Sequence, residues 1–244
     1  MKTIPNFLAS LVITCATGIV AAQQSRPKIN PHAKAHLEQI NLTRGICAVF
    51  GLSREEGSAY VVDLARGSDL TIYFQSSKTS DLTAVREAAD ESGLLGQRVF
   101  VEKGDWKRIH LATNLADVAL VNSSATGTIE EKELLRVLHP GGTAFLGNRR
   151  ITKPPLEGTD SWSHPYHGPD NNPQSADRIA RAPYLTQFVA EPKFSPMPQV
   201  SVGAGGRIFK SFGHIAHKAN QNAVLNTLVC LNAYNGTILW KRPL

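Results

Sequence analysis

The sequence predicts an α/β protein: a parallel sheet flanked by helices, followed by a proline-rich strap and a small all-β unit. Three observations lead to this prediction. Between residues 44 and 150, short apolar runs alternate with segments of helical periodicity. Nine of the fourteen prolines lie between residues 151 and 200. After Met197 the chain changes to short β-type runs that end in an Asn-Gly turn.

The first 22 residues have the pattern of a secretory signal peptide. Lys2 precedes an apolar stretch from Phe7 to Val20, and small residues lead up to Gln23. The stretch is too short and too interrupted to make a stable membrane span. We therefore expect a secreted or periplasmic protein that begins at Gln23. An uncleaved membrane anchor and a lipidated Cys15 are the alternatives.

Composition and charge exclude several classes of protein. The chain has 244 residues, of which 42% are apolar and 19% charged, as in globular proteins. The formal net charge of +6 is dispersed, with +3 in residues 1–43, −1 in 44–150 and +4 in 151–244. Without a basic stripe to follow phosphates, we expect no nucleic-acid partner. Signal cleavage would leave Cys47 and Cys230, each in an apolar run, as buried free thiols.

The α/β part begins after a linker at residues 23–43. Strands are expected at residues 45–50, 70–74, 98–101, 117–121 and 143–146. The intervening helices are expected to start at a Ser53–Glu56 capping box, to span 81–92, and to run from a Thr128–Glu131 capping box to Pro140-Gly141-Gly142. Strands joined by such helices need right-handed crossovers and form a parallel sheet. A ligand site then lies beyond the carboxyl ends of the strands.

Two segments carry a resemblance to a known family. The run Glu133–Leu146, with its Leu-His-Pro-Gly-Gly centre, is similar to the segment that leads from a helix into the fifth strand of class I S-adenosylmethionine-dependent methyltransferases. Gly104-Asp105-Trp106 and the run Leu111–Val121 resemble that family's approach to its fourth strand. The resemblance covers residues 44–150 and implies a minimal Rossmann-like domain.

The resemblance implies a role for five residues in holding S-adenosylmethionine. Gly51 would let the backbone approach the amino-acid end of the cofactor, and Gln75 would lie at its ribose hydroxyls. Asp105 would accept a hydrogen bond from the adenine amino group, while Trp106 would pack on the adenine. Asn122 would lie near the transferred methyl group.

Two departures from the family's pattern predict a degenerate pocket. The loop from Gly51 to Gly57 lacks a dense run of glycines, so larger side chains stand where the backbone must approach the cofactor closely. Gln75 is neutral where an acidic residue usually binds the ribose, which removes a charge-assisted bond. A binding or scaffold role is therefore expected, and an active methyltransferase is the alternative.

The last part of the chain is expected to form a strap at 151–195 and one β-blade at 196–244. The run Leu231–Trp240 is similar to the repeat of pyrroloquinoline-quinone-type β-propellers, in which a glycine turn precedes a Trp. A propeller closes with about four to eight blades, so one blade alone is not expected to bind the quinone. Either further blades of a longer chain or another copy would cover it. A fragment of a quinoprotein-like dehydrogenase is the second alternative.

Two pairs of histidines have i, i+3 spacing: His164 with His167, and His214 with His217. Four imidazoles are a suitable set for Zn²⁺ or Cu²⁺. Histidines that bond backbone carbonyls in the strap are the alternative, because no carboxylate lies at a fixed offset from either pair. No Gly-x-Ser-x-Gly elbow and no P-loop occur in the sequence.

Overall fold

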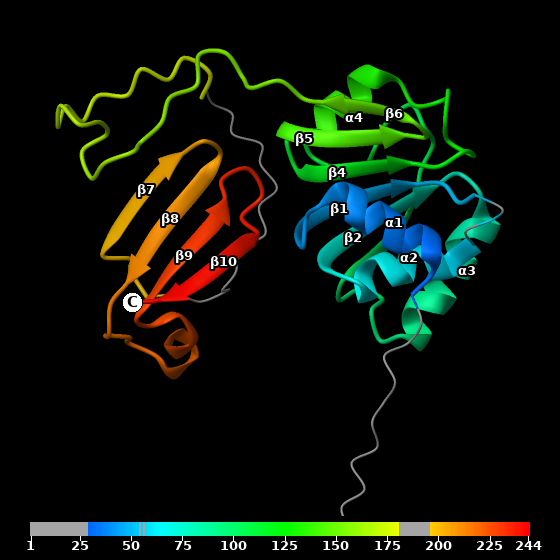
Figure 1. The fold of residues 1–244 in the computed structure, drawn as a ribbon, viewed down its shortest axis with the longest axis horizontal. Coiled ribbons are helices and arrows are strands. Elements are labelled where there is room, and N and C mark those ends of the chain that lie inside the picture. The colour runs from blue at the N-terminus through cyan, green and yellow to red at the C-terminus, as the bar shows by residue number, and fades with distance from the viewer. Residues whose placement is uncertain (1–28, 54, 56, 181–195) are drawn as a thin grey trace, which may run out of the picture.

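The computed structural model describes residues 29–53, 55, 57–180 and 196–244. It contains two sheets, the larger within residues 44–152 and the smaller within residues 200–243 (Figure 1). The expected signal peptide at residues 1–22 and the end of the strap at 181–195 lie outside the described residues. Within the described part, no helix is long and apolar enough to cross a membrane.

The larger sheet has six strands in the order β3-β2-β1-β4-β5-β6. Their bounds are β1 Arg44–Phe50, β2 Asp69–Ser76, β3 Val99–Lys103, β4 Ala116–Val121, β5 Leu138–Leu146 and β6 Arg149–Thr152. The first five strands are parallel, which confirms the predicted α/β fold, and β6 is antiparallel to β5. The order of the strands reverses between β1 and β4, and ligands bind at such switch points in open α/β sheets.

Helices cover both faces of this sheet (Figure 1). α1 (Pro31–Ile40), α2 (Gly57–Arg66) and α3 (Thr79–Glu91) pack on one face, where Tyr60, Leu64 and Phe74 are fully buried. α4 (Glu131–Val137) and the chain between β3 and β4 cover the other face, around Phe50 and Leu134. These two apolar layers hold the strands and fix where their ends lie.

The segment expected to be a linker contains helix α1. Asn30 caps this helix, since its side chain accepts a hydrogen bond from the backbone N–H of His32 at 2.8 Å. The backbone N–H of Asn30 donates to Asp63 of α2 at 2.8 Å, and Ala33 is completely buried. Residues 31–40 are thus part of the α/β layer, which corrects the linker prediction for this stretch.

The boundary between α4 and β5 also differs from the prediction. Thr128 does not cap the helix; its hydroxyl donates to the carbonyl of Ala125, and α4 begins at Glu131. The helix ends at Val137, and Pro140-Gly141-Gly142 belongs to β5. A residue before proline is disfavoured in helical conformation, so His139 adopts extended backbone and starts the strand early.

The smaller sheet, here called the C-terminal sheet, is an antiparallel meander of four strands in the order β10-β9-β8-β7. Its strands are β7 Val200–Ala204, β8 Arg207–Phe212, β9 Thr227–Asn232 and β10 Ile238–Pro243, with the 3-10 helix η1 (Ala219–Val224) between β8 and β9. Phe212, Val224 and Val229 form a small core of their own with Leu231 and Ile238. The expected all-β unit with an Asn235-Gly236 turn is therefore present.

The described part of the strap contains no helix and only isolated bridges between residues 153 and 180. One bridge joins it to the edge of the C-terminal sheet. The backbone N–H of Trp162 donates to the carbonyl of Gly203 at 2.7 Å, and Gly203 donates back to Trp162 at 2.6 Å. The strap is thereby attached to β7.

Candidate functional site

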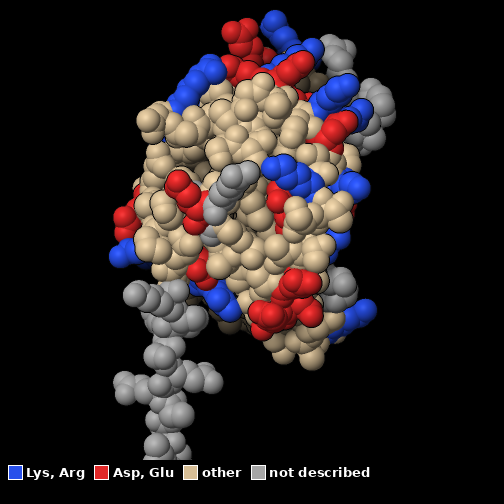
Figure 2. Space-filling model, turned by 90° about the vertical axis from the view of Figure 1, so that its right-hand side faces the viewer, with Lys and Arg blue, Asp and Glu red and all other residues tan. Residues whose placement is uncertain are grey.

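The carboxyl ends of the parallel strands form the edge where a ligand site was expected. Figure 2 shows this edge, on which Lys and Arg side chains are interspersed with Asp and Glu. A cavity of about 630 Å³ lies at the switch point between β1 and β4. It is lined by His36, Ser53, Glu55, Leu120, Val121, Asn122, Ser123, Thr126, Phe145 and Gly147.

Gln75 lies at the end of β2, where the resemblance implies a contact with the ribose. The side chain is completely buried. Its amide nitrogen donates to the carbonyls of Asp105 at 2.8 Å and Arg108 at 3.3 Å. Its amide oxygen accepts from the hydroxyl of Tyr73 at 2.7 Å and from the backbone N–H of His110 at 3.1 Å. A glutamine side chain can donate two hydrogen bonds through its amide nitrogen and accept two at its amide oxygen. All four are made within the protein at Gln75.

Asp105 and Trp106 belong to the chain that Gln75 holds. The Asp105 carboxylate accepts from the backbone N–H groups of Lys107 at 3.0 Å and Arg108 at 3.3 Å, which makes a local turn. Trp106 is partly buried against the apolar layer that includes Ile109 and Leu111. The loop from residue 104 to 110 is therefore folded down onto the end of β2.

Gly104 lets this loop come close to Gln75. A Cβ added at Gly104 would lie only 2.6 Å from the Gln75 amide nitrogen and 2.7 Å from its amide carbon. Any larger residue at position 104 would push the loop away from the strand. In this chain the glycine thus serves contact with the protein's own side chain.

Gly51 and Asn122 lie at the ends of β1 and β4. Gly51 has a φ of +72°, and a Cβ there would lie 2.1 Å from the hydroxyl oxygen of Ser124. The Asn122 amide nitrogen donates to the carbonyl of Gly51 at 2.9 Å. The hydroxyl oxygen of Ser124 is buried and has no hydrogen-bond partner within the described structure. The space beside Gly51 is therefore occupied by the loop that follows β4.

The five expected cofactor residues form two groups. Gly51 is bonded to Asn122, and Gln75 is bonded to the backbone of Asp105, with Trp106 next to it in the chain. Of the five, only Asn122 lines the cavity at the switch point. The expected residues thus lie in one group of two and one group of three, and most of their polar groups are bonded within the protein itself.

The four histidines do not come together. Among the described residues, no group of three or more His, Cys, Asp or Glu side chains is placed to hold a metal ion. His164 and His167 pair through their backbones, and the His167 imidazole donates to Asp160 at 2.7 Å. His214 and His217 lie in the loop between β8 and η1, with exposed side chains.

Asp160 organises the strap turn around these histidines. Its carboxylate accepts from the backbone N–H of Ala176 at 2.7 Å, from His167 and from the hydroxyl of Ser175. The bond from Ala176, followed by that from His167, lowers the pKa of Asp160 to about 2. Asp160 is therefore the carboxylate that the spacing of the histidines did not reveal. It lies seven residues before His167, and the turn brings the two side chains together.

The amino edge of the parallel sheet carries a buried polar cluster that the sequence did not reveal. Asp117, 7% exposed, is the second residue of the fully buried strand β4 and accepts hydrogen bonds from four groups. These are the backbone N–H of Ile46 at 2.7 Å, the His139 ring at 3.0 Å, and the side-chain amides of Asn232 and Asn235, both at 2.8 Å. We call this set the Asp117 cluster.

The Asp117 cluster joins the two sheets. Asn232 ends β9, and Asn235 lies in the turn before β10, so both amides come from the C-terminal sheet. Asn235 also donates to the carbonyl of Leu115 at 2.8 Å, and it is completely buried. The ring of Tyr234 stacks on His139 with centroids 5.2 Å apart. In the sequence, the signals for this cluster are a lone Asp in an apolar strand and two Asn near an Asn-Gly turn.

The environment of His139 favours the charged form of its ring. Burial lowers the pKa of the imidazole, but the hydrogen bond to Asp117 and the charge of that carboxylate together outweigh it, so the pKa is raised. The other ring nitrogen faces the carbonyl of Pro140 at 2.7 Å. Each nitrogen therefore faces an acceptor, which favours an imidazolium, while the Asn232 amide nitrogen also lies 3.3 Å from Nε2.

Cys47 and Cys230, the cysteines of the described residues, are free and buried, as expected. Burial, with a smaller contribution from Asp117, raises the pKa of Cys47 far above its ordinary value. Burial also raises the pKa of Cys230, against the opposing charge of Arg207. Neither thiol has the depressed pKa of a reactive nucleophile.

No protein-family model and no curated protein matches the chain. Solved structures do match. A protein from Methanococcus maripaludis named as an S-adenosyl-L-methionine-dependent methyltransferase is 23% identical, covers 48% of this chain and 53% of its own, and gives a TM-score of 0.41. A SAM-dependent methyltransferase from Aquifex aeolicus is 20% identical over 46% of this chain and 61% of its own, with a TM-score of 0.39.

A third match is geranyl diphosphate C-methyltransferase from Streptomyces coelicolor, solved with S-adenosyl-L-homocysteine. It is 13% identical over 46% of this chain and 43% of its own, with a TM-score of 0.40. The chain spans about half the length of the solved structures it matches. At these identities and TM-scores the likeness says nothing of an activity of this chain.

Proposed function

We propose that the α/β part is a methyltransferase-type fold with a closed cofactor pocket, and that the chain works as a scaffold that presents its C-terminal sheet. The observation that carries this proposal is the full hydrogen bonding of Gln75 within the protein. An adenosyl group needs free polar groups at the ends of the second and third strands. Here those groups hold the loop 104–110, so the residues present do not fit S-adenosylmethionine.

Titration calorimetry of the full chain with S-adenosylmethionine tests the closed pocket. We expect no heat of binding at about millimolar cofactor. The alternative, an active methyltransferase, predicts binding tighter than about 100 µM that Asp105→Ala abolishes. Gln75→Asp is the informative gain-of-function variant, because its shorter carboxylate releases the loop and restores a charged acceptor for ribose hydroxyls. Binding by this variant alone would support closure of an ancestral pocket.

The scaffold role is supported by the Asp117 cluster. A scaffold must hold the part it presents in a defined position, and the side-chain amides of Asn232 and Asn235 attach the C-terminal sheet to one buried carboxylate at the amino edge of the parallel sheet. The cavity at the switch point lies at the opposite, carboxyl edge. The attachment of the C-terminal sheet is thus independent of any ligand at that cavity.

We also propose that the C-terminal sheet is the first blade of a quinoprotein-type propeller. Its four antiparallel strands in meander order, its Asn235-Gly236 turn and Trp240 support this interpretation. Under this interpretation, further blades or another copy would cover the open edge of the blade. Sequencing the DNA downstream of codon 244 tests the proposal. More repeats with a glycine turn and a Trp would support it, and would also favour a fragment of a quinoprotein-like dehydrogenase.

Export is the remaining proposal from the sequence. Expression of the full reading frame in a bacterium with a periplasm, followed by sequencing of the amino terminus of the periplasmic protein, tests it. A terminus at Gln23 is expected. Retention of residues 1–22 would favour an uncleaved anchor, and a lipid on Cys15 would favour a lipoprotein.

A further inference from the structure

One face of the C-terminal sheet carries an apolar row that crosses all four strands. Strand pairing places Val202 opposite Phe209, Phe209 opposite Cys230, and Cys230 opposite Trp240. Directly paired residues of antiparallel strands point to the same face of a sheet. The rings of Phe209 and Trp240 lie 6.0 Å apart, and Cys230 between them has no exposed surface. We call this face, with Val200 at its edge, the aromatic face.

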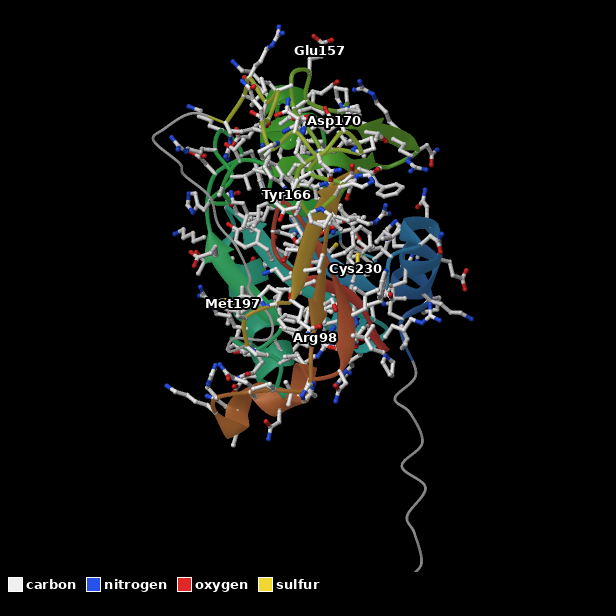
Figure 3. The ribbon with its side chains drawn as sticks, turned by 90° about the vertical axis from the view of Figure 1, so that its left-hand side faces the viewer. Arg98, Glu157, Tyr166, Asp170, Met197 and Cys230 are labelled. Atoms are coloured by element: carbon white, nitrogen blue, oxygen red, sulfur yellow. The ribbon has the colours of Figure 1, made fainter. Side chains whose placement is uncertain are left out.

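The two faces of the sheet differ in burial. The opposite face supplies Phe212, Val229 and Leu231 to the small core, and these side chains are between 1% and 5% exposed. On the aromatic face, Trp240 is 40% exposed and Val200 45%. Figure 3 views the molecule from the side of the C-terminal sheet, with Cys230 labelled. One face is therefore packed, while the other leaves large apolar side chains in water.

Positive charge flanks the apolar row on the same face. Arg207 pairs with Asn232 on one side of the row, and Arg242 pairs with Leu228 on the other. Residues 196–244 contain five Lys and Arg and no Asp or Glu. Every ion pair between described residues lies before residue 168. No carboxylate of the described chain neutralises these two guanidinium groups.

We propose that the aromatic face docks a partner polypeptide whose surface carries Asp and Glu around an apolar centre. The apolar row supplies buried area, with Trp and Arg as the residue types that dominate binding energy at interfaces. Arg207 and Arg242 select the charge of the partner, because like charges brought together at an interface are strongly unfavourable. The same repulsion disfavours a second copy of this face, which would oppose arginine with arginine. This inference names the partner of the proposed scaffold and does not involve S-adenosylmethionine.

The test uses the full chain and two synthetic probes. One probe is a β-hairpin peptide with Val and Ile on one face and Glu at the flanking positions, and the other has Lys in place of every Glu. Neither contains Trp, so a blue shift of Trp240 fluorescence reports docking, and Trp240→Phe removes the signal. We expect the Glu hairpin to bind at least ten times more tightly than the Lys hairpin.

Charge reversal provides the matched comparison. The double variant Arg207→Glu/Arg242→Glu is expected to reverse the preference between the two hairpins. Lys241→Glu makes the same kind of change on the opposite face, where Lys241 is exposed, and should leave the preference unchanged. Circular dichroism checks that the variants are folded.

Three results would overturn the proposal. The first is equal binding of the two hairpins, and the second is no binding of either. The third is a dimer of the chain in analytical ultracentrifugation that Trp240→Asp disperses, since a second copy would then occupy the face. Calorimetry with S-adenosylmethionine is a separate measurement, so failure of the docking surface and failure of the closed pocket are distinguishable.

Discussion

Nε2 of His139 lies 3.0 Å from a carboxylate oxygen of Asp117 at the amino edge of the parallel sheet. Two asparagines of the C-terminal sheet also donate hydrogen bonds to this carboxylate. Asp117 is the second residue of β4, and His139 is the second residue of β5. Neighbouring parallel strands therefore place the two side chains together. The turn that carries Asn235 then bonds to Asp117, so one carboxylate connects both halves of the molecule.

Removing the charge of Asp117 is expected to destabilise the protein. Asp117→Asn keeps the shape of the side chain but places an amide among four donors, so at least two bonds are lost while the site stays buried. Breaking a buried, hydrogen-bonded charge of this kind costs about 3–5 kcal/mol. Urea unfolding followed by circular dichroism measures the change.

Asp69→Asn is the matched control for this variant. Asp69 pairs with Arg44 at 3.1 Å, but both side chains are largely exposed, at 62% and 43%. Exposed pairs contribute about 0–1 kcal/mol. Equal effects of the two variants would contradict the role assigned to the Asp117 cluster.

The raised pKa of His139 predicts that stability depends on pH. A group whose pKa is raised in the folded state stabilises the fold fully below its unfolded value of 6.5, and this contribution is lost as the pH rises through the folded value. Burial and the charge of Lys153 oppose the shift, and the hydrogen bond and charge of Asp117 drive it. We expect the free energy of unfolding to fall as the pH rises above about 6.5.

His139→Gln isolates this dependence. Glutamine can donate one bond to Asp117 but does not titrate, so the difference in unfolding free energy between the natural chain and the variant should shrink as the pH rises. The measurement is a set of urea unfolding curves at several pH values. A difference that is constant with pH would mean that His139 does not titrate in this range.

The sequence predicted the parallel sheet well because its signals are local. Runs such as Cys47 to Phe50 are apolar at every position, which is typical of strands buried on both faces. Glycines and prolines marked most of the turns between them. The end of α4 was misplaced because Pro140 and the glycines after it were interpreted as a helix stop, although they lie inside β5.

The candidate site was harder to predict because it depends on contacts between distant residues. Gln75 was recognised as an unusual residue, but nothing local shows that it bonds a loop 30 residues further on. The bond from Asn232 to Asp117 joins residues 115 positions apart. Helix α1 was missed because its stability comes from packing on α2, and its sequence has only a weak apolar pattern.

Gln75→Ala is expected to release the loop 104–110. The variant leaves the carbonyls of Asp105 and Arg108 and the hydroxyl of Tyr73 without their partner, and each unsatisfied buried group costs about 1–3 kcal/mol. Trypsin should then cleave faster after Lys107 and Arg108. Gln97→Ala, at an exposed position, is the control and should leave the cleavage rate unchanged. Equal cleavage of the two variants would show that Gln75 does not hold the loop.

The Ser124 side chain lies beside Gly51, and this predicts that no room for a ligand remains at the end of β1. Gly51→Ala has two separate costs: a positive φ of +72°, which disfavours a Cβ by about 1 kcal/mol, and a clash with the Ser124 hydroxyl oxygen at 2.1 Å. Ser124→Ala removes that oxygen, and the Ser124 Cβ lies at 3.5 Å, which is ordinary contact. Gly51→Ala alone should therefore lose more stability than Gly51→Ala/Ser124→Ala, with a favourable interaction of about 1–3 kcal/mol in the double-mutant cycle. Urea unfolding of the four proteins measures it. Additive effects would mean that Ser124 does not fill the space beside Gly51, and that the approach to the strand end is open to a ligand.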